Sequence, residues 1–124
     1  MGVVHAKRQE DAMDSLFFPD ETVALDTIDP GKVTRKVRAH GDKTMIVEVF
    51  FETGAIGSEH AHPHEQLSYC LGGEFDFFIA GKVRSMRAGD SILIPGGARH
   101  GVKCVAKGRL LDVFSPPRED FLSR

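Results

Sequence analysis

The chain lacks several features that would point to common classes of function. It has only two cysteines, Cys70 and Cys104, with no C-x-x-C spacing, so neither a zinc ribbon nor a dithiol redox motif is predicted. We expect both thiols to be small buried hydrophobic groups. A formal net charge of −2 provides no positive excess for a phosphate backbone, and we predict no nucleic-acid partner. No nucleotide, flavin or pyridoxal motif is present either.

Long apolar stretches are also missing. No window approaches the roughly 18 apolar residues of a membrane-spanning helix. The N-terminal sequence "MGVVHAKRQEDAMDSLFF" lacks the uninterrupted apolar core of a signal peptide. We therefore expect no membrane partner and a cytoplasmic location.

Helical periodicity is nearly absent, whereas short β-rich runs separated by glycines recur along the chain. The strongest runs are 44–51, 74–80, 91–95, 100–106 and 109–115, and weaker ones are 22–28 and 33–39. Spacings of about ten residues predict an all-β sandwich or small barrel of short antiparallel strands. Residues 22–124 are predicted to form this single domain, with 1–21 as an N-terminal arm that is either loose or a short helix around 10–18.

Glycines and apolar positions add two local predictions. Gly41, Gly81, Gly89 and Gly108 each stand where a hairpin needs a positive φ angle. Run 44–51, "TMIVEVFF", has apolar residues at both its odd and its even positions. This pattern predicts a strand covered on both faces. One cover is the barrel core, and the other is a second sheet or a second subunit.

The stretch "HAHPHEQ" (60–66) contains three histidines at alternate positions. In a regular strand His60, His62, His64 and Gln66 would share one face, although Pro63 can bend the register beyond the first pair. Such a pair is either a two-point chelate or simply a polar strand face. A third imidazole, His100, opens another run, and metals take three or four ligands converging from different elements. His5 and His40 match no pattern and are expected to be solvated.

The spacing of these residues resembles the two motifs of the cupin family. The first motif, G-x5-H-x-H-x3-Q-x6-G, begins at Gly54, and the second, G-x5-P-x-G-x2-H, begins at Gly89; together they cover 54–104. The resemblance implies a cupin double-stranded β-helix, a jelly-roll barrel that hides its strand edges. It also implies one divalent transition metal (Ni, Zn, Mn, Fe or Cu) in the barrel mouth, held by His60, His62, Gln66 and His100.

Two positions depart from the usual cupin pattern. Glutamate usually stands where this chain has Gln66, and asparagine where it has Cys104. Glu65 is an alternative ligand, but in a regular strand it faces away from His60 and His62, so we favour Gln66. A neutral carboxamide leaves the charge of a divalent ion uncompensated, which favours Lewis-acid chemistry over dioxygen chemistry.

The last run offers an acid/base candidate. In "RLLDVFSPPREDF" (109–121), Asp112 points either into the barrel cavity or outward, and the alternation alone leaves both readings open. Arg118 follows the two prolines that end the strand. A cavity aspartate near a metal would act as a general acid/base, and a nearby arginine would pair with a substrate carboxylate.

The stretches 60–66, "SYCLGGE" (68–74) and "DVFSPPREDFL" (112–122) together are similar to small cupins of the KdgF group. Those are metal-dependent enzymes of pectin and alginate breakdown that convert cyclic 4,5-unsaturated uronates to linear keto-sugar acids. The similarity implies that Asp112 shuttles a proton, Arg118 pairs with the substrate carboxylate and Phe114 walls the sugar pocket.

The leading hypothesis is thus a metal-dependent lyase or isomerase that acts without redox change on a small carboxylated substrate, such as a sugar acid. The alternatives are a cupin dioxygenase that uses iron or copper, and a cupin that binds a small ligand without turnover. The doubly apolar run 44–51 and the cupin resemblance both predict a homodimer.

Overall fold

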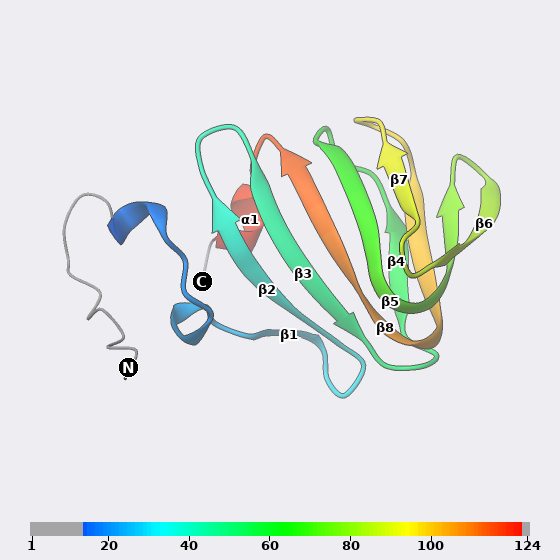
Figure 1. The fold of residues 1–124 in the computed structure, drawn as a ribbon. Coiled ribbons are helices and arrows are strands. Elements are labelled where there is room, and N and C mark those ends of the chain that lie inside the picture. The colour runs from blue at the N-terminus through cyan, green and yellow to red at the C-terminus, as the bar shows by residue number, and fades with distance from the viewer. Residues whose placement is uncertain (1–13, 123–124) are drawn as a thin grey trace.

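The computed structural model describes residues 14–122, and its strands confirm the predicted all-β class. Two short 3-10 turns, η1 (Asp14–Leu16) and η2 (Asp20–Thr22), precede the strands, and a short helix, α1 (Glu119–Leu122), follows them (Figure 1). The strands are β1 (Asp26–Asp29), β2 (Val33–His40), β3 (Met45–Phe51), β4 (Ile56–His60), β5 (Glu65–Ile79), β6 (Lys82–Arg87), β7 (Ser91–Ile94) and β8 (His100–Ser115).

Two long strands, β5 and β8, run through both layers of the barrel. The C-terminal half of β8 pairs with β3 and with the N-terminal half of β5, which also pairs with β7. The N-terminal half of β8 pairs with β4 and with the C-terminal half of β5, which also pairs with β6. All of these pairs are antiparallel. The result is the predicted double-stranded β-helix, with β2 and β1 extending the first layer beyond β3.

The prediction of a turn at Gly108 is wrong, because runs 100–106 and 109–115 form one continuous strand, β8. At the middle of β8 the chain passes very close to the bulged middle of β5. A Cβ atom on Gly108 would lie 2.0 Å from the carbonyl oxygen of Gly72, and one on Gly73 would lie 2.5 Å from that of Ala106. These glycines permit a close backbone approach where both long strands change layer.

Two other local predictions need correction. The weak run 22–28 becomes strand β1 only at 26–29, because residues 20–22 form η2. Gly41 lies in a hairpin as predicted, but its φ is not positive, whereas Gly81 and Gly89 have the expected φ of 78° and 93°. Most of the helix predicted around 10–18, and His5, lie outside the described residues; within the remainder, Asp14–Leu16 forms η1. The arm at 1–21 stays a prediction.

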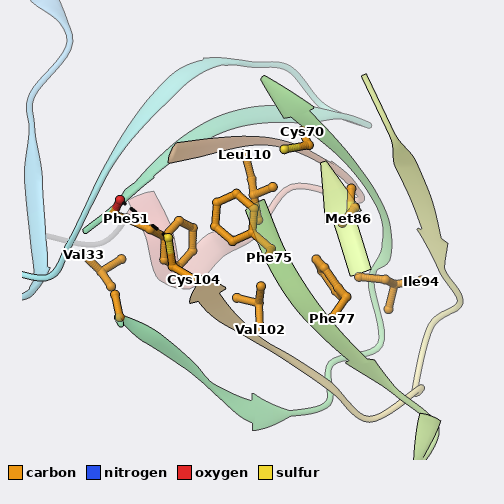
Figure 2. Close-up of a cluster of buried hydrophobic side chains, with 11 residues drawn as sticks. Val33, Phe51, Cys70, Phe75, Phe77, Met86, Ile94, Val102, Cys104 and Leu110 are labelled. Carbon is orange, nitrogen blue, oxygen red and sulfur yellow. Dashed lines mark hydrogen bonds between the residues drawn. The ribbon is translucent and has the colours of Figure 1, made fainter. Parts of the chain in front are cut away.

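The core fills the space that the two layers enclose. Figure 2 shows its side chains pointing inward from strands all around the barrel. Phe51 and Phe75 meet edge to face with ring centroids 5.2 Å apart. Cys70 and Cys104 are fully buried in this cluster, so their predicted place in the core is confirmed. A second, smaller cluster of buried apolar side chains consists of Val37, Met45, Val47 and Phe114.

The outer face of β3 tests the prediction that this strand is covered on both sides. Met45, Val47 and Phe51 are buried inside, but Ile46 on the other face is exposed. The second cover is therefore not another sheet within residues 14–122. Within the same residues, no helix is long and apolar enough to span a membrane.

Candidate metal centre

Three imidazoles from different parts of the chain converge in the barrel mouth. His60 ends β4, His62 lies in the following loop, and His100 begins β8 directly opposite His60 in the strand pairing. One ligand atom from each of the three rings lies within 4.8 Å of those from the other two. The strand alternation predicted from "HAHPHEQ" is broken at Ala61, yet the loop still directs His62 toward the other two rings.

The backbone determines which nitrogen of each ring is available. Nδ1 of His60, His62 and His100 donates to the carbonyl oxygen of Ser58, His64 and Ala98, respectively, at 2.8, 3.1 and 2.9 Å. A neutral imidazole with a proton on Nδ1 has its lone pair on Nε2. Such backbone hydrogen bonds orient metal-ligating histidines in proteins, so all three rings present Nε2 as the ligand atom.

Gln66 presents an oxygen to the same place. Its Oε1 lies 2.9 Å from Nε2 of His62, while its Nε2 donates to Oγ of Ser68 at 2.9 Å. Oγ of Ser68 donates in turn to Oδ1 of Asp112 at 2.6 Å. This chain of donors ends on a carboxyl and holds the carboxamide with its oxygen toward His62. An ionised glutamate at 66 would have no proton to donate to Ser68, so this hydrogen bond requires the carboxamide.

The neighbours in "HAHPHEQ" do not join the cluster. His64 is not among the three converging imidazoles, because β4 has ended before it and its ring packs edge-on against His62 with centroids 5.4 Å apart. Glu65 begins β5 and is exposed, whereas Gln66 is buried. The alternation within β5 therefore favours Gln66 over Glu65.

Burial favours the neutral form of His62 and His100. It lowers the pKa of His62 despite an opposing contact with the side chain of Gln66, and it lowers the pKa of His100 despite a hydrogen bond to the carbonyl of Ala98. Neighbouring positive groups lower both values further. A lowered pKa favours the unprotonated ring, which is the form that binds a metal.

Asp112 faces the cavity, which decides between the two readings that the sequence left open. The carboxyl lies on the inner face of β8 and is buried. Burial raises the pKa of Asp112 to about 6, and hydrogen bonds from Ser68 and Gln66 together with the charge of Arg118 only partly offset the shift. A buried carboxyl with a pKa near neutrality can both accept and release a proton.

Phe114 and Arg118 complete the predicted set. The Phe114 ring packs edge-on against His62 with centroids 5.7 Å apart. The Arg118 guanidinium lies 5.3 Å from the Phe114 ring centroid and 4.3 Å from that of Phe121. Both residues line one cavity of about 530 Å³, which is large enough for a small organic ligand. Its polar and charged lining residues are Asp29, Arg35, Ser58, His60, Gln66, His100, Asp112 and Arg118.

Comparison with known proteins identifies the family. The pattern described as "Cupin domain" matches residues 47–114. The chain belongs to the cupin family. It is 36% identical over 108 residues to the pectin degradation protein KdgF of Dickeya dadantii (strain 3937), and the match covers 86% of this chain and 97% of that protein.

Solved cupin structures agree with this relationship. KdgF from Halomonas sp. superposes with a TM-score of 0.79 at 33% identity, covering 85% of this chain and 98% of that one. An RmlC-like cupin from Shewanella frigidimarina NCIMB 400 superposes with a TM-score of 0.80 at 38% identity, covering 85% and 94%. The predicted resemblance to small cupins of the KdgF group is confirmed.

The residues of this cupin fit a divalent transition metal. Among the described residues, Nε2 of His100 is buried without any hydrogen-bond partner, a costly arrangement unless an acceptor site of this kind serves a ligand. Nε2 of His62 and Oε1 of Gln66 are both acceptors, yet they face each other at 2.9 Å. A shared cation removes their repulsion. Imidazole nitrogens with one carboxamide oxygen suit several transition ions.

Sequence reasoning missed two residues of this cupin's site: Arg35, which lines the cavity, and Ser68, which links Gln66 to Asp112. Ser68 lies two positions after Gln66 on the same strand, so the parity rule places the two on one face and could have found it. Arg35 lies between Val33 and Val37 on the inward face of β2. The available signal in the sequence was a charged residue in the alternate positions of a strand that otherwise hold valine.

Proposed function

We propose that this cupin is a metal-dependent enzyme that opens a cyclic 4,5-unsaturated uronate, or a similar small enolisable carboxylic acid, to its linear keto form. One observation carries the proposal. Three converging imidazoles, with the Gln66 carboxamide oxygen beside that of His62, lie next to a carboxyl that has a pKa of about 6 and is linked to Gln66 through Ser68. Homology to a pectin degradation protein supports the substrate class.

The ligand set suits non-redox catalysis. A divalent metal bound by His60, His62, Gln66 and His100 would supply a Lewis acid that polarises a substrate oxygen. Because Gln66 is neutral, the protein adds no negative charge at this ligand position. The neutral donors leave the full charge of the ion available to the substrate, which favours this chemistry over dioxygen activation.

Asp112 is proposed to move the proton. Ring opening breaks the bond between the anomeric carbon and the ring oxygen, and the anomeric hydroxyl loses its proton as it becomes an aldehyde. The ring oxygen takes up a proton and becomes an enol, which turns into the ketone when a proton is added to the adjacent carbon and the enol hydroxyl loses its own. The reaction is an isomerisation and needs no oxidant or water. A carboxyl with a pKa of about 6 can accept one of these protons and deliver another.

The remaining predicted residues bind and orient the substrate. Arg118 contributes positive charge next to the cavity for the substrate carboxylate. Phe114 forms an apolar wall between His62 and Arg118, against which a sugar ring can pack. Asp112 and His100 are buried, whereas His60 is exposed, so electrostatic interactions are strengthened at the inner side of the site and screened by water at its rim.

The first test is metal analysis of the protein purified without an affinity tag, in parallel with His62→Ala and His64→Ala. We expect about one equivalent of a transition metal in the wild type and in His64→Ala, and almost none in His62→Ala, because His64 lies outside the ligand cluster. Metal content independent of His62 would contradict the proposed centre.

The second test follows loss of the conjugated double bond of a 4,5-unsaturated galacturonate, compared with the uncatalysed rate. We expect acceleration that disappears with a chelator and returns with one divalent metal. Consumption of oxygen with ferrous iron or copper would favour a dioxygenase instead. Binding of the sugar acid without acceleration would favour a ligand-binding cupin.

We further propose that two copies of the chain associate through the outer face of the first layer. An apolar row crosses four strands there, in which Ile46 pairs with Val113, Val113 with Leu67, and Leu67 with Leu93. Ile46, Leu67 and Leu93 are exposed, and a contiguous apolar surface of this kind favours self-association. The cytoplasmic location stays a prediction from the sequence.

Light scattering coupled to size-exclusion chromatography tests the homodimer. Leu93→Glu places a charge in the apolar row and is expected to give monomers. Val83→Glu is the matched control, since Val83 is 54% exposed and Leu93 53%, but Val83 lies on β6, outside the row. A wild-type monomer, or equal behaviour of both variants, would contradict this interface.

A further inference from the structure

Arg35 places a second arginine at the cavity, in addition to Arg118. It lies on the inner face of β2, where it pairs with Val49 on β3, and its side chain lines the cavity that also contains Asp112. Its guanidinium carbon lies 3.7 Å from the centroid of the Phe121 ring. This stacking fixes the plane of the guanidinium and leaves its edges for other partners.

The charge of Arg35 is only partly compensated within residues 14–122. Nε is buried and has no hydrogen-bond partner there. Oδ2 of Asp26 lies 3.7 Å from Nε, which is an ion pair but too long for a hydrogen bond. Burial lowers the pKa of Arg35, partly offset by Asp26 and Asp120. A desolvated guanidinium with an unused donor gains from binding an anion.

Arg118 is satisfied in a different way. Its Nε donates to Oδ1 of Asp120 at 3.1 Å, and its Nη2 donates to Oδ2 at 2.9 Å. The edge that usually forms a bidentate pair with a carboxylate is therefore occupied by the protein's own carboxylate. Arg118 lies over the same Phe121 ring as Arg35, at 4.3 Å, so the two cations are close together but differ in which donors are available.

We propose that Arg35 is the residue that binds the carboxylate of the substrate, through the part of its guanidinium that lines the cavity, while Arg118 adds positive charge beside it. The proposal rests on the proposed function in one respect, that the cavity binds small carboxylated molecules. It changes the assignment that the sequence favoured, in which Arg118 forms the bidentate pair. The ligand class is a small organic monocarboxylate, with sugar acids as the fitting example.

Calorimetric titration tests this assignment without turnover. The probes are galacturonate, which has no double bond to react, acetate as a minimal carboxylate, and galactose as the neutral control. The proteins are the wild type, Arg35→Gln, Arg35→Lys and Lys36→Gln, all loaded with zinc. Lys36 is the matched control because it lies on the same strand but on the opposite face, where it pairs with Asp20 at 3.0 Å. Unfolding midpoints establish that each variant is folded.

We expect Arg35→Gln to weaken galacturonate binding by roughly 10- to 100-fold, the loss typical of a hydrogen bond to a charged group. Its binding of galactose should be unchanged, as should all binding by Lys36→Gln. Arg35→Lys should retain part of the affinity, because it keeps the charge and loses the planar fork. The lysine variant also serves if Arg35→Gln does not fold.

The outcomes separate the two proposals. Equal galacturonate affinity in wild type and Arg35→Gln would overturn the assignment of Arg35, even if unsaturated uronates are converted. Equal loss of galactose and galacturonate binding would also overturn it, because that pattern indicates a purely structural residue. Wild-type protein that binds none of the carboxylates would overturn it as well. Carboxylate binding that depends on Arg35, without conversion of unsaturated uronates, would support it while the proposed reaction fails.

Discussion

Two groups of buried polar side chains lie on opposite faces of the first layer, and they differ in how completely their charges are paired. On the outer face, Oε1 of Glu48 accepts hydrogen bonds from Arg38 at 2.8 and 2.5 Å, and Oε2 accepts one from Arg109 at 2.7 Å. On the inner face, Asp112 accepts from Ser68, while His100 and Arg35 have buried nitrogens without partners among the described residues.

The pKa values follow this difference. Burial raises the pKa of Glu48, but the two arginines outweigh it, so the net pKa is lowered. Burial dominates for Asp112 and raises its pKa to about 6. A fully paired carboxylate stabilises the fold, whereas an incompletely paired one keeps a proton that can be exchanged. Burial of charge alone does not reveal function; incomplete pairing of that charge is the sharper indicator.

The largest expected effect comes from removing the acid/base group of the inner cluster. Asp112→Asn should lower kcat on an unsaturated uronate by about 100- to 1,000-fold, because an amide cannot shuttle a proton. Zinc content and galacturonate affinity should remain, since the carboxamide oxygen of the variant can still accept a hydrogen bond from Ser68. Steady-state kinetics with metal analysis measures this. Unchanged kcat would remove Asp112 from the mechanism.

The pH dependence of stability should have opposite signs for the two carboxyls. The pKa of Asp112 in the folded protein is raised from 3.8 to about 6. Its contribution to stability is therefore fully present below pH 3.8 and lost as the pH rises through 6. In metal-free protein, Asp112→Asn should gain about 2 kcal/mol relative to wild type between pH 4 and pH 7. Urea unfolding at several pH values measures this, and a constant difference would contradict the raised pKa.

Glu48→Gln should show the converse pattern, with stability lost and activity kept. At pH 7 we expect a loss of about 2 kcal/mol, because the amide cannot neutralise Arg38 and Arg109. The pKa of Glu48 is lowered, so its contribution is present above the usual value of 4.5 and is lost as the pH falls through the lowered one. The difference from wild type should shrink in acid. A large fall in the kcat of folded Glu48→Gln would break the comparison.

The smallest effect is expected at the rim of the outer cluster. Asp20 contacts Lys36 and Arg38, but its side chain is largely exposed, where water and salt screen an ion pair. Asp20→Asn should shift the thermal unfolding midpoint by no more than a small fraction of the shift in Glu48→Gln. A scan of both variants in low and high salt measures this. Equal shifts of the two unfolding midpoints would mean that ion pairing, and not burial of the pair, determines the stabilisation.

Local pattern was enough to predict much of the fold and part of the site. Gly81 and Gly89 lie in the predicted turns. Glycine has no Cβ and adopts a positive φ without steric cost, so the residue type alone was enough for this prediction. Gly108 was misassigned because glycine also permits close packing, and the partner at Gly72 is distant in sequence. His60 and His62 were readable as a pair, whereas the link from Gln66 through Ser68 to Asp112 joins two strands.

The sequence by itself determined the all-β class, the burial of both cysteines and the histidine spacing typical of a cupin, because alternation, turn chemistry and motif spacing act over a few residues. Only the tertiary structure decided that Asp112 faces the cavity and that β5 and β8 run through both layers. It also showed that Nε of Arg35 has no hydrogen-bond partner among the described residues, whereas Nε of Arg118 donates to Asp120. These features depend on strand register and on which charges meet across the barrel, and such contacts join residues far apart in the chain.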